Sequence, residues 1–267
     1  MRKYFYVVSI GFQNNLQYRV NYLTRTLFSF IPLFAMLSLW QTIYAGSGGV
    51  VHSGFTEAQM MFYYLMVAVV DVFTAVNEDD WQIAADIREG NISQFLVKPV
   101  DYLWYRLGLF VSGRLAFVTV ALLPLAVFIL CFRQYALPPV DGVAAAVFLV
   151  SLVGTALLQF FISYAMAMLA FWLLEISTLI FILYAFEYLA SGHLFPLALL
   201  PEPLKAVLWF TPFPYQLYFP ISVYMGEVKG TAMWTGFVTQ FAWVLLAYFL
   251  ARTIWKRGIR KYAAFGG

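Results

Sequence analysis

The sequence predicts an all-α integral membrane protein with six transmembrane helices, organised as a single domain over residues 1–267. Its composition is the first indication: 63% of the residues are hydrophobic and only 11% are charged, whereas about 25% are charged in a soluble domain. The second is the recurrence of apolar runs of about 20 residues, the length that crosses a bilayer. The third is a stretch between two such runs, residues 78–106, which holds nine of the chain's 29 charged residues. We call this stretch the charged segment.

The first twenty residues are expected to form an amphipathic helix in the membrane interface. Their apolar side chains recur at roughly helical spacing among polar ones: Tyr4, Phe5, Val8, Phe12 and Leu16. Arg2 and Lys3 resemble the start of a signal peptide, but no long apolar run follows until about Leu27. We therefore expect no cleaved signal.

Two expected spans precede the charged segment, and a third follows it. The first covers residues 22–45 and is followed by a short polar loop that ends near Gln59. The second covers residues 60–76, and the third covers residues 107–132. Each is an apolar run of the length that a transmembrane helix needs.

The second half of the chain is more apolar still. Residues 143–190 are almost continuously apolar, so the simplest reading is two spans joined by a tight turn near Glu175. Residues 194–220 are too apolar for a free loop and too rich in proline for a straight span. We expect short helices there that enter the membrane from outside and return, one of them starting at Pro203. The last span covers residues 232–251.

Basic residues are divided unequally between the two sides of the membrane, and this predicts the orientation of the chain. The side that holds both termini and the charged segment collects thirteen: Arg2, Lys3, Arg19, Arg25, Arg88, Lys98, Arg106, Arg114, Arg252, Lys256, Arg257, Arg260 and Lys261. The other side collects three: Arg133, Lys205 and Lys229. Both termini are therefore expected to be cytoplasmic.

The charged segment is predicted to contain a short helix whose acid-rich first turn begins at Asp79 or Asp80. One face of this helix is expected to carry Trp81, Ala84, Ala85 and Arg88. Gly90 supplies a left-handed stop, and Asp101 caps the next span. The segment is either a docking element for a cytoplasmic partner or an interfacial loop packed against its own helices.

Two sets of motifs resemble a known family. The run DIREG at residues 86–90, followed by LVKP at residues 96–99, resembles the "I-x-x-G … L-x-K-P" segment of ABC-2-type transporter permeases, and more narrowly of bacterial six-span permeases. Ser191-Gly192, Pro196, Pro201, Pro212-Phe213 and Phe219-Pro220 are similar to the pattern "SG…FP…LP…PF…P" of that group. The resemblance covers nearly the whole chain in span count, loop order and length.

The resemblance implies a division of the domain into functional parts. Residues 1–20 would be an elbow helix, residues 78–105 a cytoplasmic coupling loop, and residues 194–220 an extracytoplasmic re-entrant region. The coupling helix would dock on an ATPase through Asp80, Trp81, Ala84, Asp86, Arg88, Glu89 and Gly90. The location would be the inner (plasma) membrane of a bacterial cell.

The resemblance also implies partners. The sequence contains no G-x-x-x-x-G-K-[ST] motif, so it cannot hold ATP phosphates in that way. ATP and Mg²⁺ would be bound by a separate ATPase chain, present in two copies, beside a second permease that is identical or paralogous. This chain would carry no cofactor or catalytic residue of its own. The expected cargo is a hydrophobic or amphipathic substrate, such as a drug, an antibiotic peptide or a lipid-like molecule, moved outward.

Polar residues within apolar runs are candidates for a transport pathway, because ionisable groups in lipid are costly unless partnered or hydrated. Asp71 either lines a pathway or pairs with Arg25 or Arg114 in the bundle. Glu187 either lines the exit or braces the re-entrant helices, and Gln159 is a candidate cavity residue. His193 is expected to be a packed interfacial histidine.

A second class of function remains open. A stand-alone secondary transporter would use an intramembrane carboxylate, for which Asp71 is the candidate, although that class usually shows internal repeats that this chain lacks. A membrane enzyme is the least supported class. His52, His193 and the single Cys131 are too scattered to form a metal site.

Overall fold

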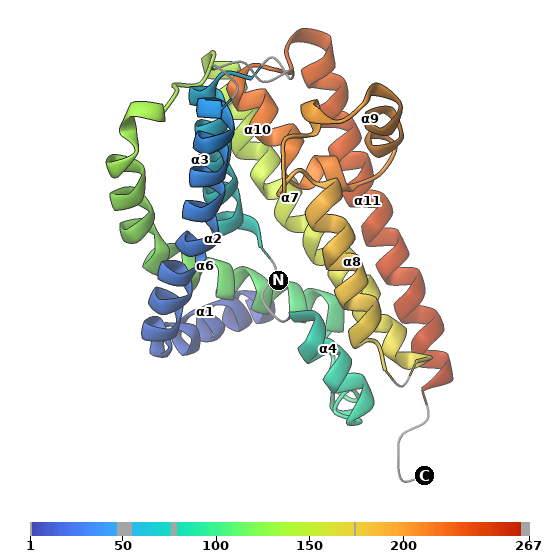
Figure 1. Cartoon of the computed structure of the whole chain (residues 1–267). Coiled ribbons are helices and arrows are strands. Elements are labelled where there is room, and N and C mark those ends of the chain that lie inside the picture. The colour runs from blue at the N-terminus through green and yellow to red at the C-terminus, as the bar shows by residue number, and fades with distance from the viewer. Residues whose placement is uncertain (1, 47–54, 76–78, 174, 263–267) are drawn as a thin grey trace.

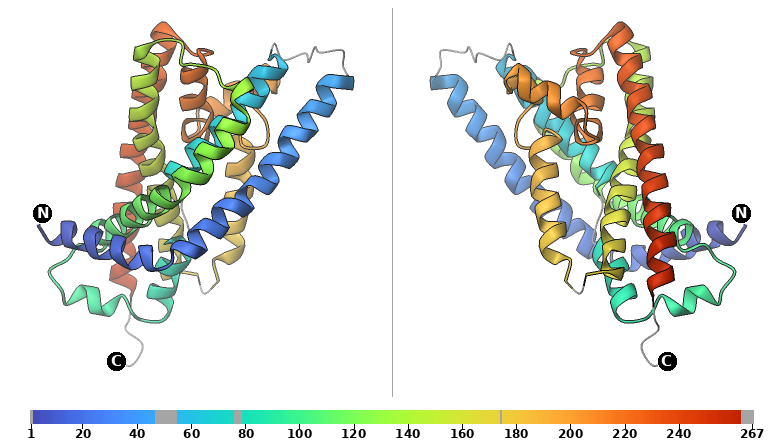
Figure 2. Two further views of the ribbon diagram at one scale, coloured as in Figure 1. Left: turned by 90° about the vertical axis from the view of Figure 1, so that its left-hand side faces the viewer. Right: turned by 90° about the vertical axis from the view of Figure 1, so that its right-hand side faces the viewer.

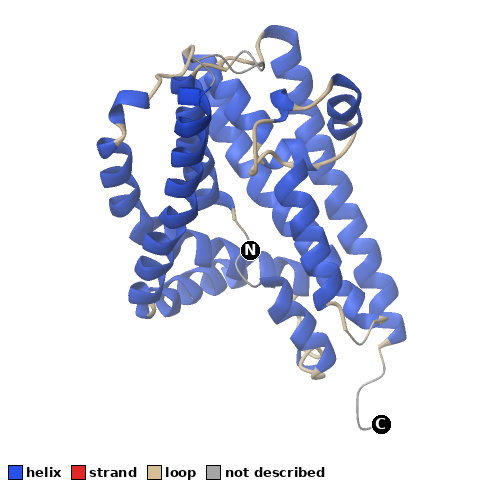
Figure 3. Ribbon diagram, in the orientation of Figure 1, coloured by secondary structure: helices blue, strands red, loops and turns tan. Residues whose placement is uncertain are grey.

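The computed structural model describes residues 2–46, 55–75, 79–173 and 175–262. All regular structure in these residues is helical, which confirms the predicted all-α fold (Figure 3). Most of the polar loop expected before Gln59 lies outside the described residues, as does Glu78 at the start of the charged segment.

Eleven α-helices follow one another along the described residues: α1 Arg2–Gln17, α2 Arg19–Gly46, α3 Glu57–Thr74, α4 Asp79–Arg88, α5 Ser93–Leu96, α6 Tyr102–Cys131, α7 Gly142–Ala167, α8 Ser177–Ala190, α9 Glu202–Trp209, α10 Tyr218–Met225 and α11 Gly230–Lys261. Short 3-10 helices connect some of them: η1 Arg133–Tyr135, η2 Met168–Phe171, η3 Leu197–Leu199 and η4 Phe213–Gln216.

Among the described residues, five helical stretches are long and apolar enough to cross a membrane: α2, α3, α6, α11 and the continuous run Gly142–Phe171. Helix α8, which lies in the fifth expected span, has only 14 residues, about 21 Å of helix against a hydrocarbon core of about 30 Å. It ends where the chain turns sharply at Gly192, whose φ is +100°. The length criterion therefore leaves the predicted count of six spans unconfirmed.

Helix α7 lies at the centre of the molecule and packs against α3, α4, α10 and α11. Helix α1 runs across the bundle and packs along α6 (Figures 1 and 2). A helix over residues 2–17 is thus present where an elbow helix was expected, although its place in the interface stays a prediction. Helix α4 and the end of α11 lie at one end of the molecule, and α9 lies at the other (Figure 2).

The proline-rich stretch forms short helices, as the sequence predicts. Helix α9 starts at Glu202 with Pro203 in its first turn, where a missing N–H costs nothing. The chain before it is held by α3, because the hydroxyls of Tyr63 and Tyr64 donate to the carbonyls of Gly192 and Leu194, both at 2.7 Å. Entry of these helices into the membrane stays a prediction.

Candidate functional site

The inner face of α4 is buried against the helix bundle. Ile83, Ala84 and Ile87 are 1%, 0% and 5% exposed, and Ala84 packs with Ile176, which precedes α8, and with Ile180 of α8. Ala84 was expected on the docking face with Trp81 and Arg88. The structure places it inside instead, because this short helix packs against α7 and η2 and Ala84 contacts Ile176 and Ile180.

Asp86, another expected docking residue, is bonded inside the chain. Its Oδ2 forms an ion pair with Nη2 of Arg106 and accepts a 2.7 Å hydrogen bond from the Tyr102 hydroxyl. Arg106 also donates from Nε to the Tyr102 oxygen at 2.9 Å, and it is only 5% exposed. These three side chains therefore fix α4 to the start of α6.

The charged segment is also tied to the last helix. Asp101 caps α6 as predicted, with Oδ1 accepting from the Trp104 N–H at 3.2 Å, while its Oδ2 lies 2.5 Å from Nη1 of Arg252. The ring of Tyr102 stacks on Trp255, with ring centroids 5.2 Å apart and an interplanar angle of 12°. Movement of this segment would therefore act on α6 and α11 together.

The turn after α4 confirms the predicted left-handed stop. Gly90 has φ +80°, a conformation that other L-residues adopt at a cost. The Gly90 carbonyl accepts a 3.1 Å hydrogen bond from the Tyr262 hydroxyl near the end of the described chain. The backbone of Gly90 thus forms the turn between α4 and α5 and binds Tyr262.

The outer face of the charged segment is exposed. Trp81 is 37% exposed, Leu96 49% and Val97 84%, and Arg88 and Glu89 are exposed as well. The side chain of Asp80, a further expected docking residue, lies outside the described part of the structure. This face combines apolar and charged groups, as protein-binding surfaces do.

Arg88 makes one contact across the surface. Its Nη1 lies 3.8 Å from Oε2 of Glu175, with both side chains well exposed. Hydrogen bonds from the hydroxyl and backbone N–H of Ser177, together with nearby Arg88, hold the pKa of Glu175 below its ordinary value. An ion pair this exposed adds little stability, so Arg88 remains accessible to a partner.

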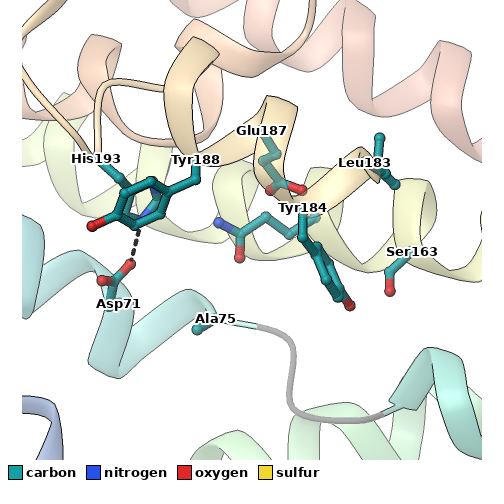
Figure 4. A pocket seen from close by; sticks show the side chains of 9 residues that line it. Asp71, Ala75, Ser163, Leu183, Tyr184, Glu187, Tyr188 and His193 are labelled. Carbon is teal, nitrogen blue, oxygen red and sulfur yellow. Dashed lines mark hydrogen bonds and ion pairs between the residues drawn. The ribbon is translucent and has the colours of Figure 1, made fainter. Parts of the chain in front are cut away.

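The three polar pathway candidates meet at one cavity of about 280 Å³ between α3, α7 and α8. Asp71 comes from α3, Gln159 from α7 and Glu187 from α8. The remaining lining residues are Ala75, Ser163, Leu183, Tyr184, Tyr188 and His193. Figure 4 shows Glu187 and Tyr184 on the same helix beside this space, with Asp71 and His193 at one side. We call this space the acidic cavity.

Asp71 has a partner that was not expected. Its Oδ1 lies 2.9 Å from Nε2 of His193, and Nδ1 of His193 lies 2.7 Å from the Ser191 hydroxyl. The ring of His193 stacks on Tyr188 at 5.2 Å between centroids. Burial alone would lower the pKa of His193, but the charge and hydrogen bond of Asp71, helped by Glu187, outweigh it and raise the pKa above its ordinary value.

Two residues of α7 that line the acidic cavity carry a buried polar atom without a partner among the described residues. Oε1 of Gln159 accepts no hydrogen bond there and Oγ of Ser163 makes none, and the two residues are only 7% and 5% exposed. Buried polar atoms are nearly always bonded. Such a pair of exceptions beside a cavity indicates a binding surface.

A second cavity of about 320 Å³ adjoins the first, between α2, α3 and α6. It shares Asp71, Tyr188 and His193 with the acidic cavity and is otherwise lined by Arg25, Arg114 and mainly apolar residues. The two expected partners of Asp71 thus lie around a common space with it. The Asp71–His193 pair stands between an acidic and a basic cavity.

Sequence reasoning missed part of this site. Tyr184, Glu187 and Tyr188 lie at spacing i, i+3 and i+4, which places them on one helix face, and Gln159 and Ser163 are likewise four apart. That spacing could have grouped them. The contact of Asp71 with His193 spans 122 positions and leaves no local signal.

Comparison with known proteins was informative at the level of the family. Neither the curated proteins nor the solved structures gave a match. The family model described as "ABC-2 family transporter protein" matches residues 30–266, which covers every described helix from most of α2 onward, including the charged segment and the acidic cavity. With its long apolar helices, the chain therefore belongs to the ABC-2 family of multi-pass membrane transporter proteins.

Proposed function

We propose that this chain is the permease subunit of an ATP-driven exporter, and that its charged segment docks on a separate ATPase. The observation that carries the proposal is the division of this segment into two faces. The inner face is bonded to α6 through Asp86 and Arg106 and to α11 through Asp101 and Arg252. The outer face is exposed around Trp81. A partner that moves the outer face would move both long helices.

The energy source lies on the partner in this proposal. ATP and Mg²⁺ bind to two copies of an ATPase, because this sequence has no phosphate-binding loop of the Walker A type. Two permeases, identical or paralogous, stand side by side, and a hydrophobic or amphipathic substrate leaves between them. Membership of the ABC-2 family supports the ATPase partner.

The proposed location is the bacterial plasma membrane, with both termini and the charged segment in the cytoplasm. The excess of Lys and Arg on that side supports this orientation. A test uses Glu202→Cys in a Cys131→Ser background, since Glu202 is highly exposed on α9. We expect an impermeant thiol reagent to label intact cells. Labelling from the cytoplasmic side alone would overturn the orientation.

Docking is tested by reversing charges on the outer face. We expect the double variant Arg88→Glu with Glu89→Lys to lose an ATPase that copurifies with the tagged wild-type chain, while its own yield is unchanged. The matched control is Glu202→Lys with Lys205→Glu, which swaps the charges of an ion pair on α9. Unchanged ATPase recovery with the first variant would contradict the docking role.

The competing proposal, a stand-alone secondary transporter, predicts a different result in a transport assay. A stand-alone secondary transporter would move substrate in vesicles that contain this chain alone, driven by an ion gradient and abolished by Asp71→Asn. The permease proposal predicts no such transport until the ATPase and ATP are supplied.

A further inference from the structure

The acidic cavity presents acceptors from three helices to a single space. Carboxylates come from Asp71 and Glu187, and oxygens without a partner come from Gln159 and Ser163. We propose that this cavity binds the protonated amine of a small amphipathic organic cation. The inference rests on the proposed function, since it names the substrate class that such an exporter would carry.

Charge is the first argument for a cation. The lining holds two carboxylates against one histidine, so it stays net negative whether or not His193 is protonated. His193 itself is engaged with Asp71 at 2.9 Å and with Ser191 at 2.7 Å. The net negative lining would repel an anion, so the cavity should exclude anionic ligands.

Hydrogen bonding is the second argument, and it is independent of charge. Gln159 Oε1 and Ser163 Oγ are buried and have no partner within the described part of the chain. An ammonium group offers three donors. Three N–H donors directed at a lining carboxylate, the Gln159 oxygen and the Ser163 hydroxyl would supply the partners that the described structure does not show for these two α7 oxygens.

Shape and surface complete the ligand description. Tyr184 and Tyr188 contribute aromatic rings and Leu183 contributes an apolar wall, and aromatic faces attract cations. The volume of about 280 Å³ lies just below the range of about 300–1,000 Å³ that is usual for drug-sized ligands. A ligand with one ring or a short alkyl chain beside its amine fits these limits. The neighbouring cavity carries Arg25 and Arg114 and does not offer this chemistry.

The test is calorimetric titration of the full chain in lipid nanodiscs with three probes of similar size. These are 2-phenylethylammonium, the neutral 2-phenylethanol and the anion 3-phenylpropionate. We expect saturable binding of the cation alone. Glu187→Gln should weaken it by about tenfold or more, because a charge-assisted hydrogen bond is lost. The matched control Glu202→Gln removes an exposed carboxylate on α9 and should leave the affinity unchanged.

Gln159→Leu provides a second route, because it removes one acceptor without changing any charge and should also weaken cation binding. Equal heats for cation and neutral alcohol, or unchanged affinity in both cavity variants, would overturn the proposal. Because the titration needs no ATPase, its failure leaves the permease proposal standing. A failure to capture an ATPase would in turn leave cation binding intact.

Discussion

The charged segment and the acidic cavity are both rich in polar side chains, but the two regions differ in whether those side chains have hydrogen-bond partners. In the charged segment, Asp86, Arg106 and Tyr102 bond to one another. In the cavity, oxygens of Gln159 and Ser163 are buried with no partner in the described structure. The first arrangement stabilises the fold. The second costs stability unless a ligand or a water molecule supplies the missing partner.

We therefore interpret the charged segment as a structural joint and the acidic cavity as a binding surface. Satisfied polar networks make a segment rigid, so a push on the outer face of α4 is passed to the long helices. Unsatisfied groups in a cavity are available to a ligand. The stability of variants at the two places should therefore move in opposite directions.

The largest expected effect is that of Asp86→Ala, which would leave Arg106 charged, 6% exposed at its side chain and without its carboxylate. We expect the free energy of unfolding to fall by about 3 kcal/mol, measured by denaturant titration of the detergent-solubilised chain. Glu89→Ala, on the exposed neighbouring position, is the control and should be near neutral. Equal effects of the two variants would contradict the claim that Asp86 fixes α4 to the start of α6.

Gly90→Ala should lower the free energy of unfolding by about 1–2 kcal/mol, the cost of a left-handed conformation for a residue with Cβ. The added carbon itself meets only the Tyr262 hydroxyl at 3.6 Å, an ordinary contact, so the cost is one of backbone conformation. The control is Gly142→Ala, where nothing lies within 4 Å and little change is expected. The same denaturant titration reads both variants.

Gln159→Leu should raise the free energy of unfolding by about 1 kcal/mol, because it removes a buried oxygen that has no partner in the described structure. The matched variant is Gln240→Leu. Gln240 is 0% exposed and its Oε1 likewise has no partner among the described residues, but its Nε2 donates to the carbonyls of Ser151 and Tyr215 at 3.1 and 2.9 Å, so the loss of these bonds should destabilise. Destabilisation by both variants would remove the contrast between the two kinds of site.

The smallest expected effect is the contribution of His193 to the pH dependence of stability. The pKa of His193 lies above its ordinary value of 6.5 in the folded chain, so the stability it contributes is full below that value and is lost as the pH rises through the folded pKa. The groups around it are Asp71, Glu187 and, across the second cavity, Arg25 and Arg114. We expect the unfolding temperature to fall as the pH is raised above the ordinary histidine pKa of 6.5, and to fall less in His193→Gln.

Local features were predictable from the sequence because local physics determines them. The stop at Gly90 and the cap at Asp101 follow from residue type and neighbours, and the apolar runs follow from the length of a bilayer crossing. Asp71, Gln159 and Glu187, singled out one by one as polar residues in apolar surroundings, line one cavity; their role in a pathway stays a prediction.

Features set by tertiary packing were not predictable. Helical spacing placed Ala84 with Trp81 and Arg88, but a helix has more than one face, and the packing of α4 on α7, η2 and the start of α8 decides which one is buried. The short α8 depends on a turn at Gly192 that α3 holds through Tyr63. The contact between Asp71 and His193 depends on the same turn.

The central claim is that the outer face of the charged segment docks on an ATPase, and site-specific cross-linking tests it most directly. In a Cys131→Ser background, Glu89→Cys and Glu202→Cys place one thiol at each end of the molecule. Membranes of the native host are treated with a short thiol-to-amine cross-linker, and the products are identified by mass spectrometry. The account predicts a product with a Walker A ATPase from position 89 and none from position 202. No ATPase product at position 89, from a folded chain at normal levels, would contradict it.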